Sequence, residues 1–168
     1  MSDVPYFVSY DEALTILRQH TLNIGTETIA LEHLYNKILA EDIQSTVDDP
    51  RFDNSAMDGF AFQYSDSTQP PAVLSIKQTL QAGTDEQLTT IEPGQAVRIM
   101  TGAPIPNCAD AILPIERCSI SDDGSEVTLH DEGKKHFIRK QGENLKRGQT
   151  ALTKGTLFSP SSVGLCAT

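Results

Sequence analysis

Residues 52–62 read Phe52-Asp53-Asn54-Ser55-Ala56-Met57-Asp58-Gly59-Phe60-Ala61-Phe62, a dense polar segment followed by a predicted strand. Its first half follows Pro50 and is rich in Asp, Asn and Ser, whose side chains fold back on the backbone and favour turns. Its second half opens a predicted strand over residues 59–63. Gly59, between the two halves, allows a positive φ or a close backbone approach. A polar turn that runs directly into a strand indicates the entrance to a β-rich region.

The sequence after this stretch continues as a series of short β-prone runs separated by Pro, Gly, Asp, Asn and Ser. Asp123-Gly124 predicts a hairpin turn and Pro93-Gly94 another turn. Short strands at this spacing are typical of a small barrel or sandwich, so residues 46–146 are expected to form one β-rich unit. The expected strands are Gly59–Gln63, Val73–Leu80, Ala96–Met100, Ala111–Ile115, Cys118–Ser121, Glu126–Leu129 and Phe137–Arg139.

The segment before this unit is predicted to contain helix and short strands. Ser9 followed by Glu12 fits a capping box, so a helix is expected over residues 9–20, with Asn23 and Gly25 ending it. Further expectations are a strand at Glu27–Ala30, helical turns over Leu31–Leu39 with Leu34, Ile38 and Leu39 turned inward, and a strand at Asp42–Thr46.

The last twenty residues are predicted to hold two extended stretches, Thr150–Thr153 and Thr156–Phe158, and then a helix. Ser159 followed by Pro160 matches an N-cap with proline at the first helical position. The helix would run to Thr168 without a stop signal, which suggests a truncated chain.

The expected fold class is mixed α+β, with a barrel- or sandwich-like domain inserted into a smaller α/β domain. Residues 1–26 would form an N-terminal helical segment. Residues 27–45 and 147–168 would form a discontinuous domain I, and residues 46–146 the β-rich domain II.

Composition narrows the class of protein. The chain has 168 residues and a formal net charge of −10, which argues against a nucleic-acid surface. Its apolar runs fall short of the roughly 18 residues that span a membrane, and its first residues do not resemble a secretory signal. Three cysteines without a CxxC pair indicate small, reduced, buried thiols. Together these features favour a cytoplasmic protein.

Positive charge is concentrated near the end of the β-rich unit. Residues 134–147 hold six basic residues and one acid, Glu143, a net charge of +5 that leaves −15 for the rest of the chain. Such an island favours an anion or an acidic partner, and it fits solvated turns equally well.

Three segments carry candidate chemistry. Asp53 and Asp58 could place carboxylate oxygens around Mg²⁺, or the first segment could simply form a capped turn. In VRIMTGAPIP (97–106), a strand runs into Thr101 and Gly102, whose hydroxyl and N–H could bind an oxyanion or form a proline-pinned turn. RKQGEN (139–144) could meet phosphate, or could be an exposed loop.

FDNSAMDGFAF, VRIMTGAPIP and RKQGEN, in this order and spacing, resemble the MoeA / gephyrin E-domain family of molybdopterin molybdenumtransferases. The resemblance covers essentially the whole chain and corresponds to the first two domains. It implies an elongated homodimer, a later α/β domain that binds molybdopterin, and an active site between subunits. The implied reaction takes adenylylated molybdopterin and molybdate, with Mg²⁺, to molybdenum cofactor and AMP, and the molybdopterin-adenylylating enzyme is an implied partner.

The resemblance also implies roles for individual residues. Asp58 and Thr101 would be catalytic, with Asp58 as a metal ligand. Substrate or other anions would contact Ser55, Gly102, Arg139 and Lys140, whereas Asp53, Asn54 and Gly59 would shape the loop. The third motif departs from the family, because Asn144 replaces a usual Asp and Gln141 a common Arg. This departure puts direct metal contact from that loop in doubt.

Two functions follow from these features. In the first, the chain is a fragment of the molybdenum-inserting enzyme and is inactive alone. In the second, it is a non-catalytic module for dimerisation or partner docking.

Overall fold

The computed structural model describes residues 7–20, 24–83 and 90–167. The chain divides into two compact units. Unit 1 combines Met1–Glu41 with Lys154–Thr168, and unit 2 is the continuous segment Asp42–Thr153. The sequence-based domain boundaries, at residues 26, 45 and 146, stay a prediction.

Unit 1 contains both α-helices of the described residues. Helix α1, Tyr10–Gln19, begins at the predicted capping box, in which the Ser9 hydroxyl accepts the N–H of Glu12 and the Glu12 carboxylate accepts the N–H of Ser9. Helix α2, Pro160–Cys166, begins at the predicted N-cap Ser159. Asn23, the predicted stop of the first helix, lies outside the described residues.

The segment at residues 27–39 differs from the prediction. Residues 27–30 form no strand, and the helical turns expected over 31–39 reduce to one 3₁₀ turn, η1, Leu31–His33. Asn36 has a φ of 61°, which a right-handed helix does not allow. Ile38, predicted to face inward, is 70% exposed and forms an isolated β-bridge with Leu157. The stretch predicted at 156–158 is therefore a bridge rather than a strand.

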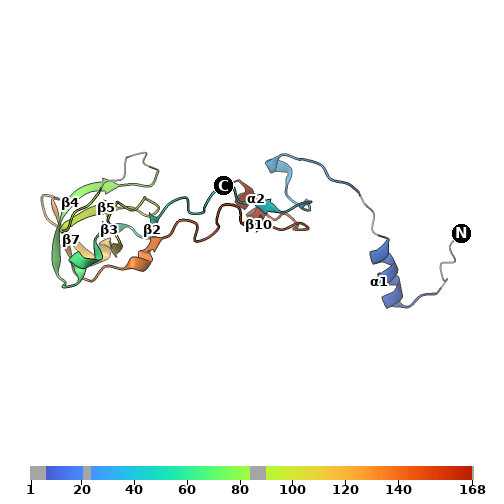
Figure 1. Ribbon diagram of the computed structural model, residues 1–168, viewed down its shortest axis with the longest axis horizontal. Helices are drawn as coiled ribbons and strands as arrows, with labels where there is room; N and C mark the ends of the chain where they lie inside the picture. The colour runs from blue at the N-terminus through green and yellow to red at the C-terminus, as the bar shows by residue number, and fades with distance from the viewer. Residues whose placement is uncertain (1–6, 21–23, 84–89, 168) are drawn as a thin grey trace. The chain divides into compact units, whose positions relative to one another are not determined.

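Unit 2 is built on one curled six-stranded sheet (Figure 1) with strand order β6-β3-β5-β4-β8-β7. Strands β4 and β5 run parallel, and the other neighbours are antiparallel. The six strands lie where the sequence predicts them, to within a residue at each end. They are β3 (Gly59–Phe62), β4 (Ala72–Leu80), β5 (Gln95–Ile99), β6 (Ala111–Pro114), β7 (Cys118–Ile120) and β8 (Glu126–Leu129).

Two short strand pairs and three 3₁₀ turns complete unit 2. Strand β1 (Ile43–Gln44) pairs with β10 (Thr150–Leu152), and β2 (Asn54–Ser55) pairs with β9 (Ile138–Arg139). The 3₁₀ turns are η2 (Tyr64–Ser67), η3 (Ile115–Arg117) and η4 (Lys135–Phe137). The described fold is thus mostly β with two helices, and its single curled sheet matches the barrel-like expectation. Insertion into an α/β domain stays a prediction.

Strand β3 is buried on both faces and has no exposed residue, whereas β4 alternates between exposed and more buried residues. Phe60 and Phe62 join one apolar cluster, and Ala61 between them joins the other. This division follows from the alternation of side chains along a strand. The first cluster has its buried members on β3, β4, β5, β6 and β8, whereas the second also takes in Ile91, Ala103 and Ile138 from the segments outside the sheet.

The three cysteines, Cys108, Cys118 and Cys166, are free, as predicted, but none is fully buried: Cys108 is exposed, and Cys118 and Cys166 are partly buried. Burial, together with the charges of Glu116 and Asp131, raises the pKa of Cys118 to about 12. Within the described ranges, no helix combines the length and apolarity needed to cross a membrane.

Candidate functional site

The three segments singled out by sequence lie side by side. Strand β2 occupies the centre: Ser55 donates its N–H to Ala103 O at 3.0 Å and accepts the N–H of Gly102 at 2.8 Å. On its other side, Ser55 pairs with Ile138 and Asn54 with Arg139. Segments 52–62, 97–106 and 139–144 therefore meet through backbone hydrogen bonds.

Asp58 and Thr101 form a corner at the end of strands β3 and β5. The backbone N–H of Thr101 donates to Asp58 Oδ1 at 2.7 Å, and its hydroxyl donates to the same oxygen at 2.8 Å. These two bonds stabilise the carboxylate and hold the pKa of Asp58 below its usual range; the backbone bond has the largest effect, and the positive charge of Arg98 adds to it. The corner is exposed to solvent, so an ionised carboxylate faces outward.

Gly59 fixes the position of this corner. A Cβ atom at Gly59 would lie 2.1 Å from the carbonyl oxygen of Leu113, because β3 and β6 approach closely there. On the adjacent residue, the Asp58 carbonyl accepts the N–H of Ile115 at 3.0 Å. The backbone of the turn is thus tied to β6 while its carboxylate is tied to Thr101.

The donors expected to bind an anion are engaged within the turn. The Ser55 hydroxyl is buried and donates to Met57 O at 2.6 Å, and the N–H of Gly102 is bonded to Ser55 O. The single proton of the Thr101 hydroxyl is donated to Asp58. These groups form hydrogen bonds within the site itself. Their predicted anion-binding roles stay predictions.

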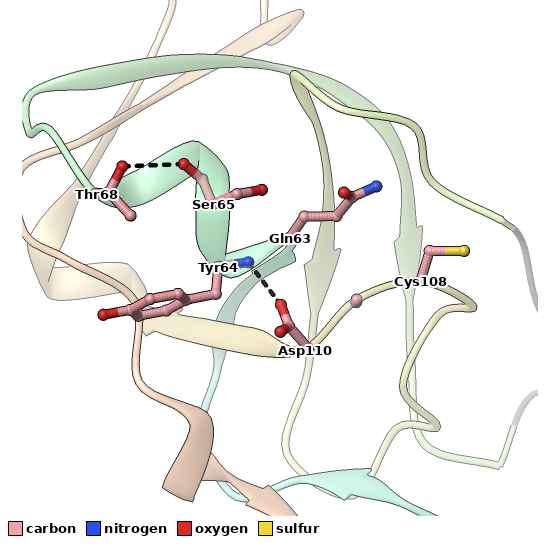
Figure 2. Close-up of a pocket in the computed structure, with 7 residues that line it drawn as sticks. Gln63, Tyr64, Ser65, Thr68, Cys108 and Asp110 are labelled. Atoms are coloured by element: carbon pink, nitrogen blue, oxygen red, sulfur yellow. Dashed lines mark hydrogen bonds between the residues drawn. The ribbon is translucent and has the colours of Figure 1, made fainter.

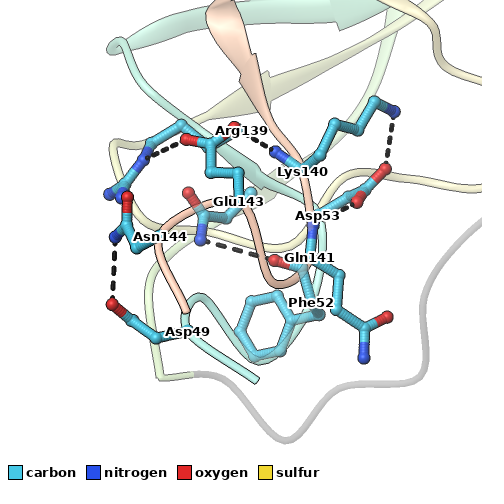
Figure 3. A network of polar contacts seen from close by, with 9 residues as sticks. Asp49, Phe52, Asp53, Arg139, Lys140, Gln141, Glu143 and Asn144 are labelled. Carbon is cyan, nitrogen blue, oxygen red and sulfur yellow. Dashed lines mark hydrogen bonds and ion pairs between the residues drawn. The ribbon is translucent and has the colours of Figure 1, made fainter. Parts of the chain in front are cut away.

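Figure 3 shows the third segment folded against Asp53. The Lys140 ammonium lies 2.7 Å from Asp53 Oδ2, and the N–H of Gln141 donates to Asp53 Oδ1 at 2.8 Å. Arg139 Nε pairs with Glu143 Oε1 at 3.2 Å. Partial burial raises the pKa of Asp53, but the bonds from Lys140 and Gln141 outweigh it, so the pKa is lowered. Both predicted anion-binding cations therefore already face carboxylates.

The two departures from the family pattern take part in local contacts. Asn144 Nδ2 donates to Asp49 Oδ2 at 2.9 Å (Figure 3), and Gln141 Nε2 donates to Asp48 Oδ2 at 2.8 Å. Amide groups at both positions thus bind carboxylates of residues 48–49, the segment that leads into the turn. Hydrogen bonds and an ion pair therefore connect the loop at 139–144 to residues 48–53.

Comparison with known proteins identifies the family of the chain. A family model described as MoeA N-terminal region (domain I and II) matches residues 8–168. The chain belongs to this family. It is 39% identical over 153 residues to the molybdopterin molybdenumtransferase of Haemophilus influenzae, covering 90% of this chain and 37% of that protein. It is 35% identical over 170 residues to the Bacillus subtilis protein of the same name, covering 96% and 39%.

A solved structure supports the same assignment. The crystal structure of the molybdopterin biosynthesis moeA protein from Pyrococcus horikoshii OT3 matches with a TM-score of 0.87 and 30% identity, over 95% of this chain and 43% of that one. This MoeA N-terminal region spans less than half the length of the relatives quoted.

A metal site is not complete within the MoeA N-terminal region. Among the described residues, no group of three or more His, Cys, Asp or Glu side chains is placed to hold a metal ion. Mg²⁺ in proteins is commonly bound through one or two carboxylates together with waters and substrate phosphates. The Asp58 carboxylate, with Oδ1 turned to Thr101, fits the part of a single ligand.

Arg98 is a residue of this MoeA region that the sequence-based candidates omit. It belongs to β5, directly opposite Phe60 on β3, and its Nε atom is buried without a hydrogen-bond partner in the described structure. A cation inside an otherwise apolar strand, Ala96 to Met100, is the sequence signal that could have found it.

Two surface hollows lie away from the predicted residues. Figure 2 shows the first, of about 530 Å³, where Asp110 accepts the backbone N–H of Tyr64 at 2.6 Å and Cys108 lies across the opening from Tyr64. The second, of about 590 Å³, is lined by Pro70, Leu113, Pro114, Arg117, Asp131, Glu132, Lys134, His136 and Phe137. Neither hollow has Asp58 or Thr101 in its lining.

Proposed function

We propose that this chain supplies one wall of the site at which molybdate is inserted into adenylylated molybdopterin, giving molybdenum cofactor and AMP. Membership of the MoeA N-terminal region family and the names of the relatives support a role in molybdenum cofactor biosynthesis. One observation carries the assignment to this surface. Asp58 and Thr101, 43 residues apart in sequence, meet in a single exposed, hydrogen-bonded corner.

In this proposal Asp58 binds Mg²⁺, and Thr101 positions the Asp58 carboxylate. Thr101 holds Oδ1, so the carboxylate keeps one orientation and stays ionised at neutral pH, and its second oxygen remains available to Mg²⁺. Bound Mg²⁺ would offset the negative charge that two anionic substrates bring to an acidic chain. Ser55, Gly102, Asp53 and Asn54 shape the wall.

The remaining ligands would come from regions that the longer relatives have in addition. Since this chain spans under half of their length, we expect the 168-residue chain alone to be inactive. Turnover by the isolated chain would contradict that expectation.

The test of the function uses the natural protein that contains this chain, supplied with adenylylated molybdopterin, molybdate and Mg²⁺. Asp58→Asn and Thr101→Val should each lower insertion at least about tenfold, because a misplaced or neutral ligand forfeits its electrostatic contribution. Asp122→Asn removes an exposed carboxylate in the β7–β8 turn and should leave the rate unchanged. Insertion at the normal rate by both Asp58→Asn and Thr101→Val would refute the proposal.

A second candidate, a non-catalytic dimerisation module, is favoured by the surface of unit 1. Helix α1 has no buried residue. Most of the exposed large hydrophobic side chains of the described structure belong to this unit: Phe7, Val8, Tyr10, Leu17, Ile24, Leu31, Tyr35, Ile38, Leu157 and Leu165. Exposed apolar surface of this extent commonly marks a protein interface.

A second copy of the same chain is the occupant we propose, in line with the homodimer that the family resemblance implies. Sedimentation of Leu17→Glu and Ile38→Glu variants tests this interface, and insertion by Asp58→Asn separates the two candidates. As a scaffold only, the protein would lose its dimer in these variants and tolerate Asp58→Asn. As an enzyme, it would lose insertion in Asp58→Asn while the dimer remains.

A further inference from the structure

Arg98 presents a donor that the fold leaves unused. Its Nε–H is shielded from solvent and has no hydrogen-bond partner among the described residues. An unmatched buried donor destabilises the folded chain, and more so on a charged group. An arginine also stays protonated under ordinary conditions, so the charge cannot be removed. The guanidinium of Arg98 therefore keeps a donor that no described side chain or backbone group accepts.

The register of the sheet places Arg98 next to the Asp58–Thr101 corner. Arg98 is directly opposite Phe60 in the antiparallel β3–β5 pair, and Asp58 precedes Phe60 by two residues. Asp58 lies in the bend immediately before β3, and a long side chain reaches its diagonal neighbour on the adjacent strand. The charge of Arg98 contributes to the lowered pKa of Asp58, which is consistent with this placement.

The guanidinium of Arg98 is close to Asp58 without being paired to it. No ion pair within 4.0 Å joins Arg98 to an acid of the described chain. The cations that the sequence favoured differ in this respect, because Arg139 faces Glu143 and Lys140 faces Asp53. Arg98 is therefore better placed than either to bind an added anion.

We propose that Arg98 binds a tetrahedral oxyanion, of the class of molybdate and phosphate, beside the Asp58–Thr101 corner. The planar guanidinium offers its terminal Nη–H donors in a fork that matches two oxygens of such an anion. This inference deepens the proposed function, on which the choice of molybdate rests. The positive charge of Arg98 would offset the repulsion between the bound anion and the ionised Asp58 carboxylate.

The experiment is a titration of the isotopically labelled chain with molybdate, phosphate and sulfate at constant ionic strength, with sodium chloride as the reference. The titration follows two NMR signals, the Arg98 Nε–H resonance and the Thr101 backbone amide resonance. A saturable shift of both with molybdate is expected. No saturable shift of the Arg98 resonance with any of the three anions overturns the proposal, and this measurement needs no variant.

Two variants assign the binding to this side chain. Arg98→Gln should weaken the affinity measured at Thr101 by about tenfold or more, because the charge and the fork are both lost. Arg98→Lys keeps the charge on a point donor and should fall between the two. Lys134→Gln removes an exposed cation that lines the second hollow and should bind as the wild type does. Equal affinity in Arg98→Gln and the wild type overturns the proposal.

The two proposals fail independently. If Asp58→Asn and Thr101→Val leave insertion unchanged while the Arg98 signals still titrate, the enzymatic function is wrong and the anion site stands. If insertion depends on Asp58 while the Arg98 resonance does not shift with any of the three anions, the function stands and the assignment of Arg98 is wrong.

Discussion

Replacing Gly59 by Ala should separate strand β3 from strand β6. The new Cβ would lie 2.1 Å from the carbonyl oxygen of Leu113 and 3.0 Å from Pro114 Cα, and these are backbone atoms inside a ladder. Carbon–oxygen contacts normally lie near 3.3 Å or beyond, so the strands must part by about 1 Å. Such a shift breaks the nearest hydrogen bonds between the two strands.

The cost follows from two contributions. Loss of two or three ladder hydrogen bonds is worth about 1 kcal/mol each, and overpacking a filled interior adds about 1–3 kcal/mol. We therefore expect the free energy of unfolding to fall by about 3–6 kcal/mol. For a chain of this length, each kcal/mol lowers the melting temperature by about 2–4 °C, so Gly59→Ala should melt roughly 10 °C lower.

Thermal unfolding followed by far-ultraviolet circular dichroism measures this effect. Gly124→Ala is the matched control in the same unit: its φ is 72°, and an added Cβ would meet no atom within 4 Å. It should cost only the left-handed backbone penalty, about 1–2 kcal/mol. If Gly59→Ala melted within about 2 °C of the wild type, the close approach of β3 and β6 would not be the reason for glycine at this position.

Three further predictions concern titration and reactivity. Thr101→Val keeps the backbone donor but loses the hydroxyl, so the pKa of Asp58 should rise partway towards its usual value in a carbon-detected NMR titration; an unchanged pKa would remove the role given to the hydroxyl. The side-chain and backbone bonds of the β7–β8 turn lower the pKa of Asp123 to about 2 from an unfolded value of 3.8, so its contribution to stability is present above pH 4 and disappears as the pH falls through 2. The loss of stability over that window should therefore be smaller in Asp123→Asn, and an identical acid profile would contradict this. Iodoacetamide at pH 8 should modify the exposed Cys108 well before Cys118, whose pKa is about 12, and mass mapping that found Cys118 alkylated first would show that its burial is wrong.

Local chemistry determined the parts of the structure that depend on neighbours in sequence. The capping box at Ser9 and the Ser159-Pro160 helix start need only residues within one turn, and both formed as predicted. The sheet strands were also predictable, because β-prone runs bounded by turn residues have few other ways to satisfy their backbone. The same reasoning failed at residues 27–30 and 31–39. In the second of these segments, Ile38 instead forms a bridge with Leu157, which is distant in sequence.

Contacts between distant segments decided the remaining features, including most of the candidate site. Sequence pointed to Asp58 and Thr101, but only the register of β3 against β5 brought them within 2.8 Å of each other. It also favoured Arg139 and Lys140 as anion binders, whereas folding placed a carboxylate against each of them.

The sequence alone thus predicts the local turns and the candidate residue types of this protein. That Arg98 keeps a buried donor without a partner among the described residues is a property of strand pairing, because compensation depends on distance in space rather than on separation in sequence.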